Sequence, residues 1–279
     1  MHKEELEQCA ARARRIRMDI LEEICAIGSG HVGGSFSIVE ALTVLYWRAL
    51  KNIDPKDPGR PGRDRFILSK GHAGPALYAT LAQRGYFPRE MLQTLNQGGT
   101  LLPSHADMNR TPGVDMTTGS LGQGLSCAVG MAYAAKIKKE DDVRIFCLIG
   151  DGESQEGQIW EAAISAANLR LDNLIVMLDY NGFQLDGALR DVVDLGDVAA
   201  KWRAFGFSTV EVDGHNLAEI DEALSMARET KGRPSMVILH TIKGKGVPFI
   251  EAMGYKNHSM PVTEETLCQA RPFLLQEVK

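Results

Sequence analysis

The segment "VRIFCLIGDGESQEGQIWEA", residues 143–162, indicates both the fold class and the position of a binding site. Its first seven residues are apolar except Arg144 and predict a buried strand, which an acidic, glycine-rich run connects to a helix. Asp151, between two glycines, has two explanations. Asp-Gly is a common turn pair, and acidic residues favour the first turn of a helix. Alternatively, the end of the strand places a metal ligand beside a bound phosphate. The rest of the sequence has to distinguish these two explanations.

Other apolar segments have the length and composition of strands, with helical patterns between them. The additional predicted strands are residues 65–69, 173–179, 208–213 and 235–241. The predicted helices include residues 4–27, 76–85, about 156–169, 194–205 and 216–230. This alternation is typical of a mostly parallel sheet with helices on both faces. We therefore predict an α/β fold in which residues 1–279 form a single domain, with an N-terminal helix and a C-terminal tail.

Two helix starts carry further signals. Ser37, followed three residues later by Glu40, has the spacing of a capping box and predicts a helix that begins at Ser37. Residues 119–140 have helical composition, but their first turn is crowded with glycine. Because glycine weakens a helix, this start predicts a close backbone approach to another group, the alternative being tight helix–helix packing.

Five polar, glycine-bearing loops directly follow predicted strands. They are residues 70–75, 150–157, 179–184, 213–216 and 241–246. Parallel sheets bind ligands at the carboxyl ends of their strands, so these loops predict one binding edge. The segment 97–118, which has no periodicity, is long enough for a functional loop or a disordered one.

Composition excludes several classes of protein. The net charge of −5, with acids and bases mixed along the chain, argues against a nucleic-acid partner. The apolar runs are shorter than the roughly 20 residues of a membrane span, and the charged N-terminus has no signal core. The five cysteines are scattered without C-x-x-C spacing, which favours a reducing, cytoplasmic location.

Asp151 and Asn181 follow predicted strands thirty residues apart. Neighbouring parallel strands would bring them together, and with one backbone carbonyl they form a set of hard oxygen ligands suited to Mg²⁺ or Ca²⁺. Gly152, without a side chain, lets a phosphate approach its N–H near a helix N-terminus. Neither Asp151 nor Asn181 is a specific signal alone, since Asp-Gly and Asn-Gly are both common turns. The pair at this spacing is a stronger signal.

Six segments, in this order, resemble those of the transketolase family of thiamine-diphosphate enzymes. They are "GSGHVGGSFS", "LSKGHAGPALYA", "TTGSLGQGLSCAVGMA", "GDGESQEGQIWEA", "LDYNGFQLDG" and "TIKGKG". The similarity covers nearly the whole chain and implies the thiamine-diphosphate-binding fold, with thiamine diphosphate and Mg²⁺ (or Ca²⁺) as cofactors.

The resemblance also implies residue roles. Asp151 and Asn181 would hold the metal by their side chains and Phe183 by its carbonyl. Gly152 would meet the diphosphate, His72 and Lys243 would lie near the cofactor, and Gly119 and Leu121 would offer backbone contacts to the aminopyrimidine. His31, His105 and His258 would face the sugar, as proton-transfer and hydroxyl-binding groups.

Three further features have a second explanation or differ from the family pattern. Glu156 and Glu161, which the resemblance also assigns to the cofactor site, match family carboxylates near the subunit interface that contains the active sites, although acidic residues at a helix start need no such role. Gly34 stands where the family often has a serine near the diphosphate, and Ser35 or a backbone N–H is a candidate substitute. His215, in "DGHN", is expected to cap a turn.

Transketolases are usually more than twice this long, and the resemblance covers their diphosphate-binding domain. It therefore implies an N-terminal subunit of a split transketolase, which moves a two-carbon ketol unit from a ketose to an aldose, either of which can be phosphorylated. The implied partners are a subunit with the pyrimidine domain and a second copy of this chain, in a heterotetramer that is active only when assembled. The alternatives are a related two-carbon transferase, a 2-oxo acid decarboxylating subunit, or a cofactor-binding module without activity.

Overall fold

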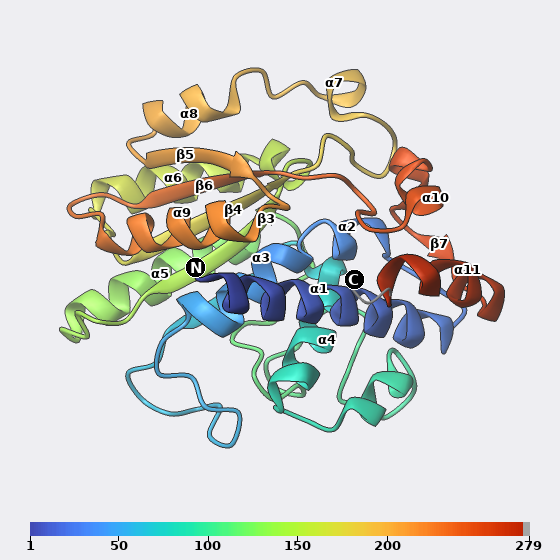
Figure 1. The fold of residues 1–279 in the computed structure, drawn as a ribbon. Coiled ribbons are helices and arrows are strands. Elements are labelled where there is room, and N and C mark those ends of the chain that lie inside the picture. Colours follow the sequence, from blue (N-terminus) through green and yellow to red (C-terminus); the bar gives the residue numbers. More distant parts are fainter. Residues whose placement is uncertain (276–279) are drawn as a thin grey trace.

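The computed structural model describes residues 1–275, so the end of the predicted C-terminal tail, residues 276–279, lies outside the described residues. Its centre is a five-stranded sheet in the order β2-β3-β4-β6-β5, in which all neighbouring strands are parallel (Figure 1). The strands are β2 (Arg65–Leu68), β3 (Ile145–Gly150), β4 (Leu174–Tyr180), β5 (Ser208–Asp213) and β6 (Ser235–His240). The apolar strands β3, β4 and β6 are buried between two helical layers, whereas the edge strand β5 is partly exposed.

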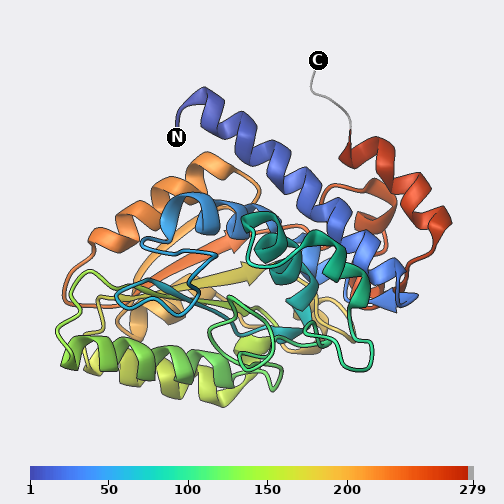
Figure 2. The ribbon, with the colours of Figure 1, turned by 90° about the horizontal axis from the view of Figure 1, so that it is seen from below.

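Helices cover both faces of the sheet, as Figure 2 shows with the sheet between two layers. One layer contains α1 (Lys3–Cys25), α3 (Val39–Val44), α4 (Gly74–Arg84) and α9 (Leu217–Glu229). The other contains α5 (Gln123–Ile137), α6 (Gly157–Asn168) and α8 (Val198–Ala204). The predicted α/β class with helices on both faces is confirmed.

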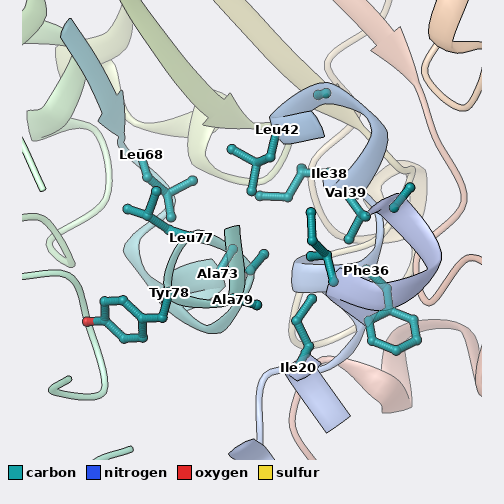
Figure 3. Packing of buried hydrophobic residues seen from close by; sticks show 14 of the residues in the cluster. Ile20, Phe36, Ile38, Val39, Leu42, Leu68, Ala73, Leu77, Tyr78 and Ala79 are labelled. Carbon is teal, nitrogen blue, oxygen red and sulfur yellow. The ribbon is translucent and has the colours of Figure 1, made fainter. Parts of the chain in front are cut away.

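The side chains of β3 alternate between two cores because successive residues of a strand point to opposite faces. Phe146 and Leu148 join the core under α1, α3, α4 and α9, and Ile145 and Cys147 join the core under α5, α6 and α8. Figure 3 shows part of the first core, to which Ile20 of α1, Leu42 of α3 and Leu77 of α4 contribute side chains.

Shorter elements complete the described chain. The strands β1 (Ser29–Gly30) and β7 (Met260–Pro261) pair antiparallel. The remaining α-helices are α2 (Gly33–Phe36), α7 (Leu189–Val192), α10 (Pro248–Glu251) and α11 (Glu264–Leu274). Other helical turns cover Leu45–Ala49, Gly71–Ala73, Arg89–Thr94, Glu153–Gln155 and Gly254–Asn257. Within residues 1–275, no helix combines the length and the apolar character needed to cross a bilayer.

Three predicted helix starts were wrong. The helix expected at Ser37 begins at Val39, and the Ser37 hydroxyl does not cap it but donates to Asp179 Oδ2 at 2.8 Å. The helix expected from residue 119 begins at Gln123, because Gly119 and Gly122 have φ angles of +151° and +89°, outside the helical region. The helix expected from residue 194 also begins four residues later, at Val198, and the other predicted helices agree with the structure to within two residues at each end.

Candidate active site

A cavity of about 380 Å³ lies at the carboxyl ends of the strands, where the sequence predicts a binding edge. All the predicted site residues except Glu161 line it. They are His31, His72, His105, Gly119, Leu121, Asp151, Gly152, Glu156, Asn181, Phe183, Lys243 and His258. Glu161 is exposed on α6 and is not among the lining residues.

Asp151 and Asn181 follow β3 and β4, which pair in parallel with Gly150 opposite Asp179. The two oxygens of Asp151 accept hydrogen bonds from backbone N–H groups, Oδ1 from Gly152 at 2.8 Å and Oδ2 from Gly182 at 2.6 Å. Asn181 Oδ1 accepts from the Phe183 N–H at 3.1 Å. The loops after two neighbouring strands therefore meet through these contacts.

Asp179, which sequence reasoning did not select, connects four loops of the site. It is fully buried and accepts from Ser37 Oγ, Lys70 Nζ, Asn181 Nδ2 and Thr241 Oγ1 at 2.5–2.8 Å. Burial raises the pKa of Asp179, but the Lys70 ammonium and these hydrogen bonds outweigh burial and lower it overall. Because Asp179 accepts from Nδ2 of Asn181, the amide oxygen of Asn181 points the other way, toward Phe183.

The residues present fit a divalent metal. Burial, together with the nearby Asp179 charge, raises the pKa of Asp151 to about 6, so a cation would relieve an unfavourable buried carboxylate. Asp151, Asn181 and the Phe183 carbonyl supply the hard oxygen donors that Mg²⁺ prefers. Residues 1–275 contain no group of three or more His, Cys, Asp or Glu side chains that could hold a metal. A metal ion bound by Asp151 would take amide and carbonyl oxygens as its other protein ligands, which would leave positions for phosphate oxygens.

Two buried lysines make the same cavity favourable for an anion. Lys70 Nζ donates to the Gly34 carbonyl at 2.9 Å as well as to Asp179, and Lys243 Nζ lies 3.2 Å from the Phe183 carbonyl. Burial and the charge of Lys70 lower the pKa of Lys243 to about 8. The negative charge of a diphosphate would offset the hydration that these ammonium groups lose on burial.

Four histidines from distant segments gather at one side of the cavity. The His31 ring centroid lies 5.5 Å from that of His72, 6.0 Å from His105 and 5.3 Å from His258. Burial lowers the pKa of His31 and His105, and burial followed by the charge of Lys243 lowers that of His258 to about 3. These imidazoles are uncharged at neutral pH, so each can both donate to and accept from a hydroxyl.

Glycines in the predicted motifs are required by close packing within the chain. A Cβ on Gly71 would lie 2.8 Å from the Gly119 nitrogen, and one on Gly124 would lie 2.7 Å from Ser69 Cβ. The glycine-rich start of α5 therefore packs against the loop after β2. Close packing between the start of α5 and this loop, rather than between two helices, therefore explains Gly71 and Gly124.

The position of the family serine is filled differently. A Cβ on Gly34 would lie 3.2 Å from His72 Nε2 and 3.3 Å from Lys70 Nζ. Ser35 is not free to substitute, because its hydroxyl donates to the His31 carbonyl at 2.6 Å. Lys70 and His72 therefore occupy the space beside Gly34.

Sequence reasoning also missed Lys70, Glu153, Gln155 and Gln184, which line the cavity. Glu153 is buried and accepts from Ser69 Oγ, the Gly122 N–H and the Gly150 N–H at 2.5–3.0 Å, so it fixes two glycine loops. A signal existed for Lys70 and Glu153, since both stand inside the motifs "SKGH" and "GDGES".

The family model described as "Transketolase, thiamine diphosphate binding domain" matches residues 7–275. The chain is 56% identical over 254 residues to the 6-deoxy-6-sulfo-D-fructose transketolase subunit SqwG of Clostridium sp. (strain MSTE9), covering 91% of each chain. It is 42% identical over 262 residues to an apulose-4-phosphate transketolase subunit of Actinobacillus succinogenes, covering 94% of this chain and 93% of that one.

Solved structures of longer proteins share the fold. The transketolase of Pichia stipitis in complex with sedoheptulose-7-phosphate has a TM-score of 0.90 at 29% identity, covering 96% of this chain and 41% of that one. The transketolase of Campylobacter jejuni has a TM-score of 0.87 at 31% identity, covering 98% of this chain and 43% of that one.

Proposed function

Because the chain belongs to the transketolase family, we propose that it is the diphosphate-binding subunit of a two-subunit transketolase, which moves a two-carbon ketol unit from a ketose to an aldose. The observation that carries this proposal is the meeting of Asp151, Asn181 and Phe183 with Lys243 at one strand-end cavity. The shared sheet between the two cores supports treating the chain as a single domain.

Thiamine diphosphate, when bound, supplies the electron sink that lets a carbon–carbon bond of the sugar break and form. Asp151, Asn181 and the Phe183 carbonyl would hold a divalent metal, Mg²⁺ or Ca²⁺, against the diphosphate. Gly152 would meet the diphosphate with an N–H that donates to Asp151 Oδ1 in this structure, while His72 and Lys243 offer donors. The backbone of Gly119 and Leu121, which also line the cavity, would contact the aminopyrimidine.

His31, His105 and His258 would receive the sugar hydroxyls. Their lowered pKa values keep the imidazoles neutral at pH 7, and a neutral imidazole can take the proton of a hydroxyl that becomes a carbonyl. The cluster favours polyhydroxylated sugars over 2-oxo acids, which have fewer hydroxyls to bind. The names of the two relatives suggest ketoses that carry an anionic group as the first candidates.

The proposed partners are a subunit that carries the pyrimidine domain and a second copy of this chain, in a heterotetramer. Two subunit relatives of similar length support the split arrangement. The helices α5 and α6 expose Tyr133, Ile137 and Ile164, at 45%, 64% and 58%, which suits contact with another subunit. Glu156, at the N-cap of α6, and Glu161, on α6, would lie near such an interface. The five free cysteines fit a reducing cytoplasm.

Calorimetric titration with thiamine diphosphate tests the cofactor site, with Mg²⁺ or with EDTA, on the chain co-purified with a co-expressed pyrimidine-domain subunit. We expect binding that needs the metal and is lost in Asp151→Ala. His240→Ala is a matched control, because this imidazole is half-exposed and contacts Glu211 outside the cavity. Metal-independent binding, or unchanged binding by Asp151→Ala, contradicts the metal assignment.

A ketol-transfer assay with the assembled enzyme tests the reaction. Donors should include fructose 6-phosphate and 6-deoxy-6-sulfo-D-fructose, with aldose phosphates as acceptors and a 2-oxo acid as an alternative donor. We expect transfer from a ketose. Turnover of the 2-oxo acid alone supports the decarboxylase alternative, and cofactor binding without turnover supports the inactive module.

A further inference from the structure

His215, in the loop between β5 and α9, contacts two segments far away in the sequence. Its Nδ1 lies 3.0 Å from Glu40 Oε2 on α3, and its Nε2 accepts the backbone N–H of Ile242 at 2.8 Å. The side chain is 11% exposed. The expected turn cap was wrong for this side chain, because the bond that closes the local turn uses the backbone N–H of His215, which donates to Asp213.

The two contacts define the tautomer of His215. The Ile242 N–H can only donate, so Nε2 must carry a lone pair and Nδ1 must carry the proton. Nδ1–H then donates to Glu40. Burial raises the pKa of Glu40, but Arg17 and His215 outweigh it and lower that pKa to about 2, so the acceptor is a carboxylate. A carboxylate behind an imidazole orients the ring, as it does behind metal-bound or catalytic histidines.

Arg17 fixes the carboxylate in turn. Its guanidinium donates to both oxygens of Glu40, at 2.6 and 2.7 Å, and to the Phe36 carbonyl at 3.0 Å. Both residues of this pair are buried. A bidentate, buried ion pair is rigid, so Arg17 and Glu40 anchor the imidazole of His215 to the core of the molecule.

Ile242 immediately precedes Lys243, and its side chain is 44% exposed. Lys243 reaches into the cavity, where Nζ lies 3.2 Å from the Phe183 carbonyl and 3.1 Å from His258 Nδ1. Neighbouring residues of the loop are also bonded, with Thr241 N donating to Tyr180 O and Gly244 N to Gly33 O. Between them, His215 accepts the N–H of Ile242, a residue that is nearly half exposed.

We propose that His215 is a positioning residue of the active site, which fixes the backbone from which Lys243 reaches Phe183 and His258. Glu40 and Arg17 complete a chain of contacts from α1 to the cavity. The proposal has a structural half, that His215 holds the backbone of loop 241–246, and a functional half, that this contact supports cofactor binding. The effect on cofactor binding rests on the function proposed above.

Hydrogen–deuterium exchange of the purified chain tests the structural half, using peptides that cover residues 241–246. His215→Ala removes both contacts. His215→Gln retains an acceptor long enough to reach the Ile242 N–H, whereas His215→Asn retains only a short group near Glu40. We expect exchange about fivefold faster in the Ala and Asn variants, as for the loss of one hydrogen bond, and near-normal exchange in the Gln variant. His240→Ala should leave the loop unchanged.

Titration of the same variants with thiamine diphosphate and Mg²⁺, in the assembly with the pyrimidine-domain subunit, tests the functional half. Affinity about fivefold weaker in the Ala and Asn variants, with rescue by Gln, supports positioning. Equal exchange in Gln and Asn, or unchanged exchange in Ala, overturns the proposal. If Ala loses protection in β3 as well, it has unfolded, and the comparison of Gln with Asn decides.

Faster loop exchange with unchanged cofactor affinity overturns the positioning role and leaves the proposed function standing. If the wild-type assembly itself does not bind thiamine diphosphate, the proposed function fails. The exchange data still decide whether His215 holds the loop.

Discussion

Replacing Asp151 by asparagine should stabilise the cofactor-free protein while removing metal-dependent cofactor binding. In the folded chain, burial and the Asp179 charge raise the pKa of Asp151 from 3.8 to about 6. A difference of about two pKa units corresponds to about 3 kcal/mol of unfavourable free energy when the carboxylate is charged. The asparagine removes this charge.

The substitution also has a cost. Both Asp151 oxygens accept backbone N–H groups, from Gly152 and Gly182, and an asparagine replaces one oxygen by an NH₂ donor. One donor then faces another donor, which costs about 1–2 kcal/mol. We expect a net gain of about 1–2 kcal/mol in the free energy of unfolding at pH 7.5.

Urea denaturation in EDTA measures the gain, at pH 7.5 and at pH 5. The pKa of Asp151 is raised on folding, so its unfavourable contribution is fully present above pH 6 and disappears as the pH falls through 6 toward 3.8. The advantage of Asp151→Asn should therefore shrink at pH 5. With Mg²⁺ and thiamine diphosphate the order should reverse in the assembled enzyme, because only the wild type gains binding energy. A variant that is less stable in EDTA at pH 7.5, or an advantage independent of pH, refutes the reasoning.

Other contacts of the site lead to three more predictions. Lys70→Met leaves the Asp179 charge buried without its cation and should lower the free energy of unfolding by roughly 3–5 kcal/mol in urea, whereas equal stability would show that the pair contributes little. His31→Ala and His105→Ala should each lower turnover by about 10²-fold or more while leaving cofactor affinity nearly unchanged in titrations, as expected for proton-transfer groups, and a collapse of cofactor binding without a kinetic effect would reverse these roles. The purified chain alone should show no ketol transfer, and activity should appear on adding the pyrimidine-domain subunit, so full turnover without it contradicts the split arrangement.

The local pattern of the sequence was sufficient for the architecture. The apolar runs that became β3, β4 and β6 are buried on both faces, and the helices between them allow only a parallel sheet with the loops at one edge. For the same reason, the meeting of Asp151 and Asn181 could be predicted, because each directly follows a strand and the two strands are neighbours. The roles of the histidines came from the family resemblance, and they remain predictions.

The tertiary structure decided which polar groups share hydrogen bonds. The spacing of Ser37 and Glu40 is that of a capping box, yet Ser37 bonds Asp179 and Glu40 bonds Arg17 and His215. The carboxylate of Asp179 needed buried donors, and leaving such a group unpaired costs more than losing one helix cap. Sequence periodicity specifies which face of an element is buried and, for the parallel strands, which edge of the sheet carries the polar loops. The partners of a buried charge depend on which loops meet after the sheet has assembled, and these loops come from segments as far apart as His31 and His258.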